Sequence, residues 1–180
     1  GGLLPNMGRS DAPAFNSVDA PLWFFHAVEE YCDYMGDCAR AWKLWGKALR
    51  EIFERLSGDG LLPFSIGMRP NGLIWAGEPG VALTWMDAVV NGCPVTPRTG
   101  FDVEIHALWF NAIRFMQRMY SALGKPGEAE RMALLADQVQ TSFTATFWLP
   151  QKGYLADYVD ERGANPFVRP NQLLAVSLPA

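Results

Sequence analysis

A glycine-rich stretch in the middle of the chain carries the residues that could do chemistry. The candidate carboxylates Glu78, Asp87 and Glu104 lie in residues 72–111, together with three tryptophans and one arginine, Arg98. Two carboxyl groups can supply a general acid and a general base, which is the pair that glycoside hydrolysis uses. Tryptophan rings suit the same chemistry, because an indole face packs against the apolar face of a sugar ring. We therefore interpret this stretch as a sugar-facing surface.

Asp87 is the first candidate for an acid catalyst. It follows Trp85 and Met86, and partial burial beside apolar side chains raises the pKa of a carboxyl group, as an acid catalyst requires. The alternative is that Asp87 caps a helix or a turn, and the residues alone favour neither reading. Trp85 is the best candidate for a ring that stacks on a sugar.

For the other polar residues of this stretch, a structural role is weighed against a functional one. Glu78, in Gly-Glu-Pro-Gly, suits a tight turn in which its carboxylate accepts from backbone amides, ahead of sugar contact. Arg98 is expected to pair with Glu104 or Glu78 and so to hold the loop. Glu104 and Asn111 share one helix face, where contact with a substrate and hydrogen bonds to the loop backbone are equally open.

Apolar residues at helical spacing show which elements must position this stretch. Helices are expected over residues 19–35, 37–56, 103–123 and 126–147, and a further helix begins with residues 169–172. The first of these is nearly apolar all round at its start, which predicts burial on every side. The tryptophans Trp23, Trp42, Trp45 and Trp109 are expected in the core, and His26 and His106 are expected to be satisfied core histidines.

The connections differ in length. Residues 1–16 are expected to be irregular, residues 57–101 to form a long loop with a possible short helix at 82–89, and residues 148–170 to form a second loop with a strand near 154–159. Short turns would thus join the helices in pairs, and long loops would lie at the other end. We expect an all-α fold of antiparallel helix pairs, part of an α/α toroid whose site is built by the long loops. Residues 1–180 would form a single domain that is an incomplete portion of a longer barrel.

Composition excludes several classes of protein. A hydrophobic content of 49% with 19% charged residues indicates a folded chain, and a net charge of −4 without a basic run argues against nucleic acid as a partner. Three cysteines and two histidines fit neither a disulfide framework nor a zinc site, so we expect reduced thiols and neither a metal nor another cofactor. No apolar run is long enough to span a bilayer and no signal peptide is visible, so we expect a cytoplasmic protein without a membrane partner.

Six short blocks, spread over nearly the whole chain, resemble the glucosidase domain of glycogen debranching enzymes, the amylo-α-1,6-glucosidase family. The blocks are NSVDAPLW at 16–23, GEPG at 77–80, LTWMDA at 83–88, VTPR at 95–98, VEI and ALW within 103–109, and RPNQ at 169–172. The TWMDA block and the run from TPR to ALW are the most specific. Two positions depart from the family pattern: His106 stands where an amide is usual, and residues 91–94 replace a loop that commonly contains an aromatic residue.

The resemblance implies an (α/α)₆ barrel that hydrolyses, with inversion, the single glucose left at an α-1,6 branch of glycogen or a similar branched glucan. It implies that Asp87 is the general acid and that Asp19 binds hydroxyls of the terminal sugar, although an acidic residue can also simply favour a helix N-terminus. Arg169 and Asn171, in the last block, join the substrate-binding candidates. The general base is expected downstream of Asn171, outside this chain.

Two other readings stay open. One is another exo-acting glucosidase of the same barrel type, similar to glucoamylase or trehalase. The other is a module that binds glycogen without cleaving it. A lone glutamate in an aromatic-rich loop farther along the gene would favour an enzyme over a binding module.

Overall fold

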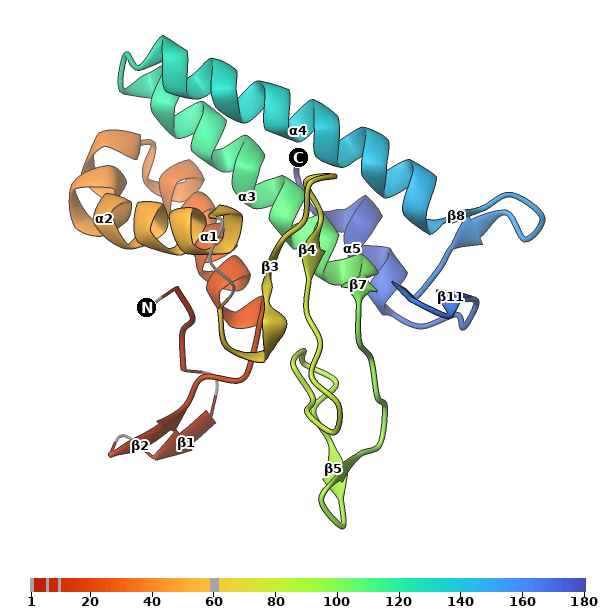
Figure 1. Cartoon of the computed structure of the whole chain (residues 1–180). Coiled ribbons are helices and arrows are strands. Elements are labelled where there is room, and N and C mark those ends of the chain that lie inside the picture. Colours follow the sequence, from red (N-terminus) through yellow and green to blue (C-terminus); the bar gives the residue numbers. More distant parts are fainter. Residues whose placement is uncertain (1, 6, 10, 59–61) are drawn as a thin grey trace.

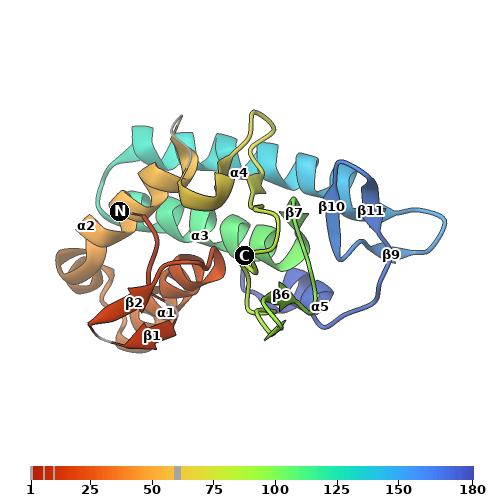
Figure 2. The ribbon, with the colours of Figure 1, turned by 60° about the horizontal axis from the view of Figure 1, so that its bottom comes forward.

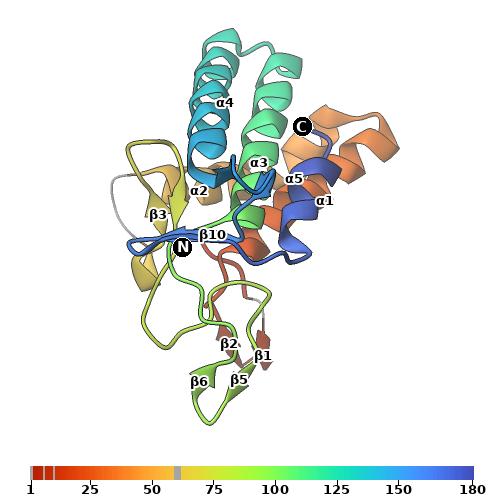
Figure 3. The same ribbon diagram turned by 90° about the vertical axis from the view of Figure 1, so that its right-hand side faces the viewer.

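The computed structural model describes residues 2–5, 7–9, 11–58 and 62–180, and in these residues five helices dominate (Figure 1). The helices are α1 (Asp19–Met35), α2 (Cys38–Ser57), α3 (Val103–Ala122), α4 (Pro126–Phe147) and α5 (Asn171–Ser177). Helix α3 is central: α4 lies antiparallel along one side of it, while α1 and α5 pack on the other (Figure 3). The predicted helices are confirmed, with ends that differ by only one or two residues.

Local signals explain where the helices begin and end. Asp37 caps α2, because its side chain accepts from the Arg40 N–H at 2.9 Å. Gly36 ends α1 in the left-handed region at φ 64°, and Gly124 turns the chain after α3 at φ 67°. Pro126 then occupies the first turn of α4, where its missing N–H costs nothing. Two or three residues therefore suffice to reverse the chain within each helix pair.

The core surrounds α3, which packs against α1, α2, α4 and the loop that precedes it. Trp109 of α3 is fully buried, stacks on Phe53 of α2 at 5.1 Å between ring centroids, and donates its indole N–H to the Gly72 carbonyl at 3.1 Å. Trp42 and Trp45 are half-buried against this core. The prediction of a core position is thus confirmed most fully for Trp109.

Short antiparallel strands order the connections, so the fold is not purely all-α. The two-stranded pairs are β1 (Met7–Arg9) with β2 (Ala12–Ala14), β3 (Gly67–Met68) with β4 (Ile74–Trp75), β5 (Val89–Val90) with β6 (Cys93–Pro94), and β8 (Trp148–Leu149) with β9 (Tyr154–Leu155). A three-stranded sheet has the order β11 (Gly163–Asn165), β10 (Tyr158–Asp160), β7 (Phe101–Asp102). A single turn of 3₁₀ helix spans Pro63–Ser65. These pairings satisfy backbone groups that a bare loop would leave unpaired.

Three sequence expectations are wrong. The N-terminal segment is not irregular, because β1 and β2 form a hairpin there, and residues 82–89 contain no helix but lead directly into β5. Helix α1 is not buried all round: Leu22 and Phe25 face the core, but Trp23 is 38% exposed. The reason is that Trp23 lies beside Trp85 and α5, where it lines a groove that is open to solvent. The β1–β2 and β5–β6 hairpins both project from the lower end of the molecule in Figure 1, the end that Figure 2 brings forward.

Candidate active site

The start of α1 and the TWMDA block meet through a backbone hydrogen bond. The Val18 N–H donates to the Leu83 carbonyl at 2.8 Å, which places the two family blocks side by side. Ser17 supports the turn into α1, since its hydroxyl accepts from the Ala20 N–H at 3.3 Å and donates to the Asp19 carboxylate. Asp19 and the loop that carries Asp87 are therefore held close together.

Asp19 is a buried carboxyl at this junction. Burial raises its pKa above the ordinary value, and the nearby Asp87 carboxylate adds to the rise. The hydrogen bond from Ser17 and the backbone amides of Asp19 and Ala20 lower the pKa again but do not cancel the effect of burial. The site thus holds two neighbouring carboxyl groups, one buried and one half-buried in an open loop.

Trp85 presents a half-exposed ring beside an apolar groove. The ring is 50% exposed, and its indole N–H donates to Asn171 Oδ1 at 3.0 Å. The groove has a volume of about 360 Å³ and is lined by Trp23, Trp85, Pro170, Asn171, Leu173, Leu174 and Ser177. Asp87 stands two residues after Trp85 and is half-buried. The structure therefore brings a carboxyl, an exposed indole ring and an apolar groove to one place.

Arg98 lies in a buried cluster of acids and is not on the groove. Its Nη2 donates to Glu104 Oε2 at 2.6 Å and to the Asp157 carbonyl at 3.0 Å, and its Nη1 donates to the other oxygen of Glu104. The Asp102 carboxylate lies 3.2 Å from the Arg98 Nε. The predicted pairing of Arg98 with Glu104 is confirmed. Glu78, the alternative partner, is exposed, and its turn is closed by the Val81 N–H, which donates to the Glu78 carbonyl at 3.2 Å.

Sequence reasoning missed Asp157, which is completely buried at the turn between β9 and β10. Asn171 Nδ2 donates to Asp157 Oδ1 at 2.7 Å, and Arg169 Nη1 pairs with Asp157 Oδ2. Both residues of the RPNQ block, which were predicted to bind substrate, thus direct polar atoms at this one carboxylate. The only signal in the sequence was an acidic residue inside the otherwise apolar segment 154–159.

The cluster is electrostatically unbalanced. Three buried carboxyl groups, those of Asp102, Glu104 and Asp157, face the guanidinium groups of Arg98 and Arg169. Burial raises the pKa of Asp102 well above its usual range, and Arg98 opposes this rise only in part. Burial raises the pKa of Glu104 too, against the hydrogen bonds from Arg98. The arrangement favours one neutral carboxyl in the cluster.

Asn111 lies apart from the groove. It is buried on α3, and its Nδ2 donates to Glu29 Oε2 at 2.5 Å, while Arg118 binds the other oxygen of Glu29 at 2.8 Å. Glu29 is on α1, about 15 Å along the helix from Asp19 by the ordinary helical rise. Asn111 therefore ties α3 to α1 and is not brought together with Asp87.

His106 is a satisfied core histidine, as predicted. Its Nε2 accepts from the Ile74 N–H at 3.0 Å, so its Nδ1 carries the proton and donates to the Asp102 carbonyl at 2.7 Å. Burial lowers the pKa of His106 to about 4, so the ring is neutral at pH 7. The His26 Nδ1 lies 3.7 Å from the Glu29 carboxylate, and His26 is only half-buried.

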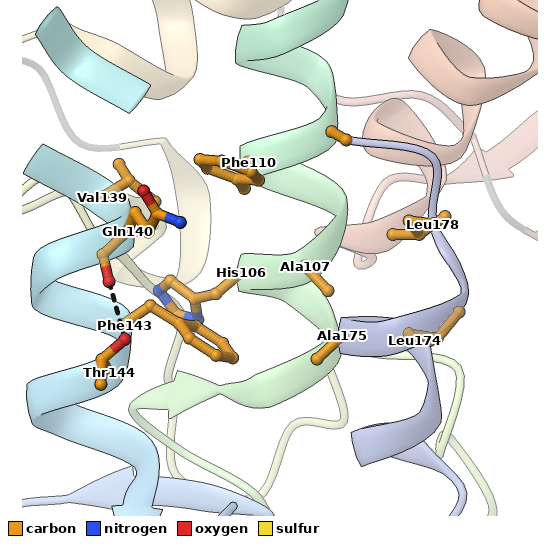
Figure 4. Close-up of a pocket in the computed structure, with 11 residues that line it drawn as sticks. His106, Ala107, Phe110, Val139, Gln140, Phe143, Thr144, Leu174, Ala175 and Leu178 are labelled. Atoms are coloured by element: carbon orange, nitrogen blue, oxygen red, sulfur yellow. Dashed lines mark hydrogen bonds between the residues drawn. The ribbon is translucent and has the colours of Figure 1, made fainter. Parts of the chain in front are cut away.

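A second apolar groove, of about 230 Å³, runs between α3, α4 and α5 (Figure 4). Figure 4 shows His106 and Phe110 of α3 facing Val139 and Phe143 of α4, with Leu174 and Leu178 on the other side. None of the candidate site carboxylates lines it. Among the residues described, no group of three or more histidine, cysteine or acidic side chains is placed to hold a metal ion. Within that same part of the chain, no helix has the length and apolarity needed to cross a membrane.

Comparison with known proteins gives the family. The family model described as amylo-alpha-1,6-glucosidase matches residues 1–180. No curated protein sequence matches the chain. Among solved structures, the GH78 family rhamnosidase of Bacillus sp. GL1 matches with a TM-score of 0.60 and 18% identity, over 88% of this chain and 15% of that one.

A rhamnosidase from Klebsiella oxytoca, solved with rhamnose bound, matches with a TM-score of 0.65 and 14% identity, over 97% of this chain and 30% of that one. At these identities the likeness shows a shared fold, and this chain spans less than a third of either structure. The family match covers every element described above, including the start of α1 with Asp19 and the loop with Asp87. The chain belongs to the amylo-α-1,6-glucosidase family.

Proposed function

We propose that this chain is the acid-bearing part of an inverting glycoside hydrolase that releases glucose from α-1,6 branch points of glycogen-type glucans. The observation that carries the proposal is the junction of Asp87 with Asp19. The Val18–Leu83 hydrogen bond holds a half-buried carboxyl beside a buried one, with the exposed Trp85 ring two residues away. Family membership supports the same reading.

In this proposal Asp87 donates a proton to the glycosidic oxygen as the bond to the terminal glucose breaks. Trp85 stacks on the sugar, and Asp19 accepts hydrogen bonds from its hydroxyls. A second carboxylate, outside this chain, activates water on the opposite face of the ring. Inverting enzymes hold their two carboxyl groups roughly 6.5–9.5 Å apart to admit that water. No cofactor is required.

The remaining candidates divide by exposure. Asn171 lines the groove beside Trp85, but only 1% of it is exposed and its amide is bonded to Trp85 and Asp157, so we assign it to support of the ring. Arg169 is half-buried next to Pro170 at the edge of the groove and can reach the sugar. Glu78 is exposed and could contact a more distant unit of the glucan. We assign Arg98, Glu104 and Asn111 to support, because their burial leaves no surface for a ligand. A cytoplasmic location, where glycogen would be met, is part of the proposal.

A second candidate is hydrolysis of a 6-deoxy sugar such as rhamnose. It is favoured by the similarity in fold to two rhamnosidases and by the groove itself, whose lining is mainly apolar and would accept a methyl group. A primary hydroxyl group would bind less well to such a wall. Hydrolysis of rhamnosides in preference to α-1,6 glucosides would select this candidate.

The test is glucose release from a limit dextrin by the full-length protein and by its Asp87→Asn variant. We expect a rate at least ~100-fold lower in the variant, the scale of lost general acid catalysis, with an unchanged melting temperature. Asp137→Asn, which neutralises an exposed carboxylate on α4, is the matched control. Near-normal turnover in Asp87→Asn would contradict the assignment of the acid.

The same assay separates the alternatives. Preference for α-1,4 over α-1,6 oligosaccharides would indicate a glucoamylase-like enzyme, preference for trehalose a trehalase-like one, and binding without hydrolysis would indicate a glycogen-binding module. Residues 1–180 alone should be inactive. Hydrolysis by this chain would place the base within it, with Glu78 as the first residue to test.

A further inference from the structure

Asp157 joins three segments of the chain at one buried carboxylate. It approaches Arg98 from the loop before α3, at 3.4 Å from Nε, Arg169 from the segment before α5, and Asn171 from the first turn of α5. A carboxylate without solvent exposure is costly unless donors surround it. These contacts therefore fix the positions of Asp157 and its three partners relative to one another.

The hydrogen bonds of Asn171 allow only one orientation of its side-chain amide. A carboxylate accepts hydrogen bonds, whereas an indole N–H only donates them. Because the Asn171 Nδ2 donates to Asp157 at 2.7 Å, its Oδ1 is left to accept from the Trp85 indole at 3.0 Å. The two neighbours thus fix which end of the amide is oxygen and which is nitrogen. An aspartate at this position would set two carboxylates against each other, and an apolar residue would bind neither neighbour.

Trp85 is the exposed end of this chain of contacts. Half of its surface is open to solvent, and it lines the same groove as Trp23 and Leu173. A large side chain on an open loop has considerable rotamer freedom, which a single well-directed hydrogen bond can remove. Asn171 Nδ2 also lies 3.4 Å from the sulfur of Met86, the residue between Trp85 and Asp87.

We propose that Asp157 is a positioning residue, which acts through Asn171 to fix the Trp85 ring beside Asp87. The inference rests on the proposed function, because Trp85 is taken as the surface on which the sugar stacks. Asp157 itself touches no substrate. Its contribution is to hold the ring and the acid loop in one arrangement before the sugar binds, so that this ordering need not accompany binding.

The test is a double-mutant cycle on the full-length protein. Asp157→Asn should lower kcat/KM for the branched glucan about 10- to 100-fold, because misplaced groups cost this much. Trp85→Phe keeps an aromatic ring but removes the N–H that donates to Asn171. In the Trp85→Phe background we expect Asp157→Asn to lower kcat/KM less than about 3-fold, since the connection is already broken.

Trp109→Phe is the matched control. It too removes an indole hydrogen bond, the one to the Gly72 carbonyl, but in the core. Its effect should add to that of Asp157→Asn in full. If Asp157→Asn does not fold, Asn171→Ala takes its place, because it breaks the same connection while Arg98 and Arg169 still neutralise Asp157. Additive effects with Trp85→Phe would overturn the positioning role.

A readout without substrate separates this inference from the proposed function. In the NMR spectrum of the ¹⁵N-labelled protein, the Trp85 indole signal is the one lost in Trp85→Phe. Asp157→Asn should shift that signal and speed its exchange with water, while Trp109→Phe should not. An unchanged signal would overturn the inference even if the enzyme hydrolyses glucans. Absent hydrolysis in the wild type would instead overturn the proposed function and leave the NMR result to decide the inference.

Discussion

The two ends of the helix pairs are ordered by different kinds of interaction. At the short-turn end, Gly36 and Gly124 reverse the chain in two or three residues, and the turns are exposed. At the long-loop end, residues 62–101 and 148–170 are held by hairpins and by the buried cluster around Arg98 and Asp157. The short turns are ordered by backbone conformation alone, whereas the long loops are also ordered by buried ion pairs.

Because of this difference, only the long-loop end can form a binding surface, and its order has to be stabilised separately. Backbone turns of two or three residues offer little surface for a ligand. Long connections offer a large surface, but their ordering entropy, about 1–2 kcal/mol per residue, has to be offset by strong local interactions. A guanidinium among three carboxylates offsets it without filling the groove with apolar side chains.

Removal of the central cation should damage the long-loop end most. Arg98→Met leaves Asp102, Glu104 and Asp157 buried without their main partner, and loss of one side of a buried ion pair costs about 3–5 kcal/mol. Urea unfolding should show this loss at pH 7, and the loss should shrink as the pH falls, because the stranded carboxyl groups can then take up protons. Arg131→Met, which breaks an exposed pair with Glu128, should cost under about 1 kcal/mol. Equal effects of the two substitutions would remove the contrast between the ends.

His106 should make the long-loop end sensitive to acid. Its pKa is about 4 in the folded protein and about 6.5 when unfolded, so the unfolded chain binds the proton more readily. The neutral ring therefore contributes stability that is present above pH 6.5 and is lost as the pH falls towards 4, roughly 3 kcal/mol at most. Asp102 and Glu104 act in the opposite direction, because their raised pKa values favour folding at low pH.

The substitution that isolates this effect is His106→Gln, because an amide can also accept from the Ile74 N–H. Unfolding free energies measured between pH 7 and 4 should fall less in His106→Gln than in the wild type. Parallel pH profiles of the two proteins would show that His106 does not control the acid response.

Replacing one glycine by alanine at each end gives a smaller comparison, because each substitution adds a single methyl group. Gly36 lies at φ 64° with no other side chain near its Cβ position, so Gly36→Ala should cost about 1 kcal/mol from backbone strain alone. At the long-loop end Gly100 lies at φ 124°, and a Cβ there would overlap the carbonyl oxygen of Val159 in β10. Gly100→Ala should therefore cost about 2–3 kcal/mol. Thermal unfolding checks both values, and a larger loss at Gly36 would contradict the comparison.

Much of the helical part of the fold could be predicted from the sequence, because its signals are local. Apolar spacing, Asp37, Gly36 and Pro126 give the helix limits almost to the residue. The pairing of Arg98 with Glu104 was also predictable, since Arg98 lies only six residues before Glu104, which is in the first turn of α3. The β1–β2 hairpin was missed because its strands have only three residues each and no clear alternation.

The site was less predictable, because its contacts join distant segments. Asp157 has no neighbour in sequence that reveals it, since its partners Arg98 and Asn171 come from a distant loop and from the start of α5. Trp23 was assigned to the core on composition, and the direction in which its helix face points emerges only from the packing of α1. Asn111 shares a face of α3 with Glu104, but helical spacing does not show that this face meets Glu29 of α1.

The hydrogen bond between Trp85 and Asn171 has a consequence for the order of events during folding. It joins residues 86 positions apart, and the Val18–Leu83 bond also spans two separate blocks. Contacts of such separation form late, after local helices have closed the intervening chain. A nascent chain that has emerged from the ribosome only as far as α4 can therefore assemble its helix pairs, but it lacks the residue that fixes Trp85. We expect the groove to be the last part of this chain to take shape.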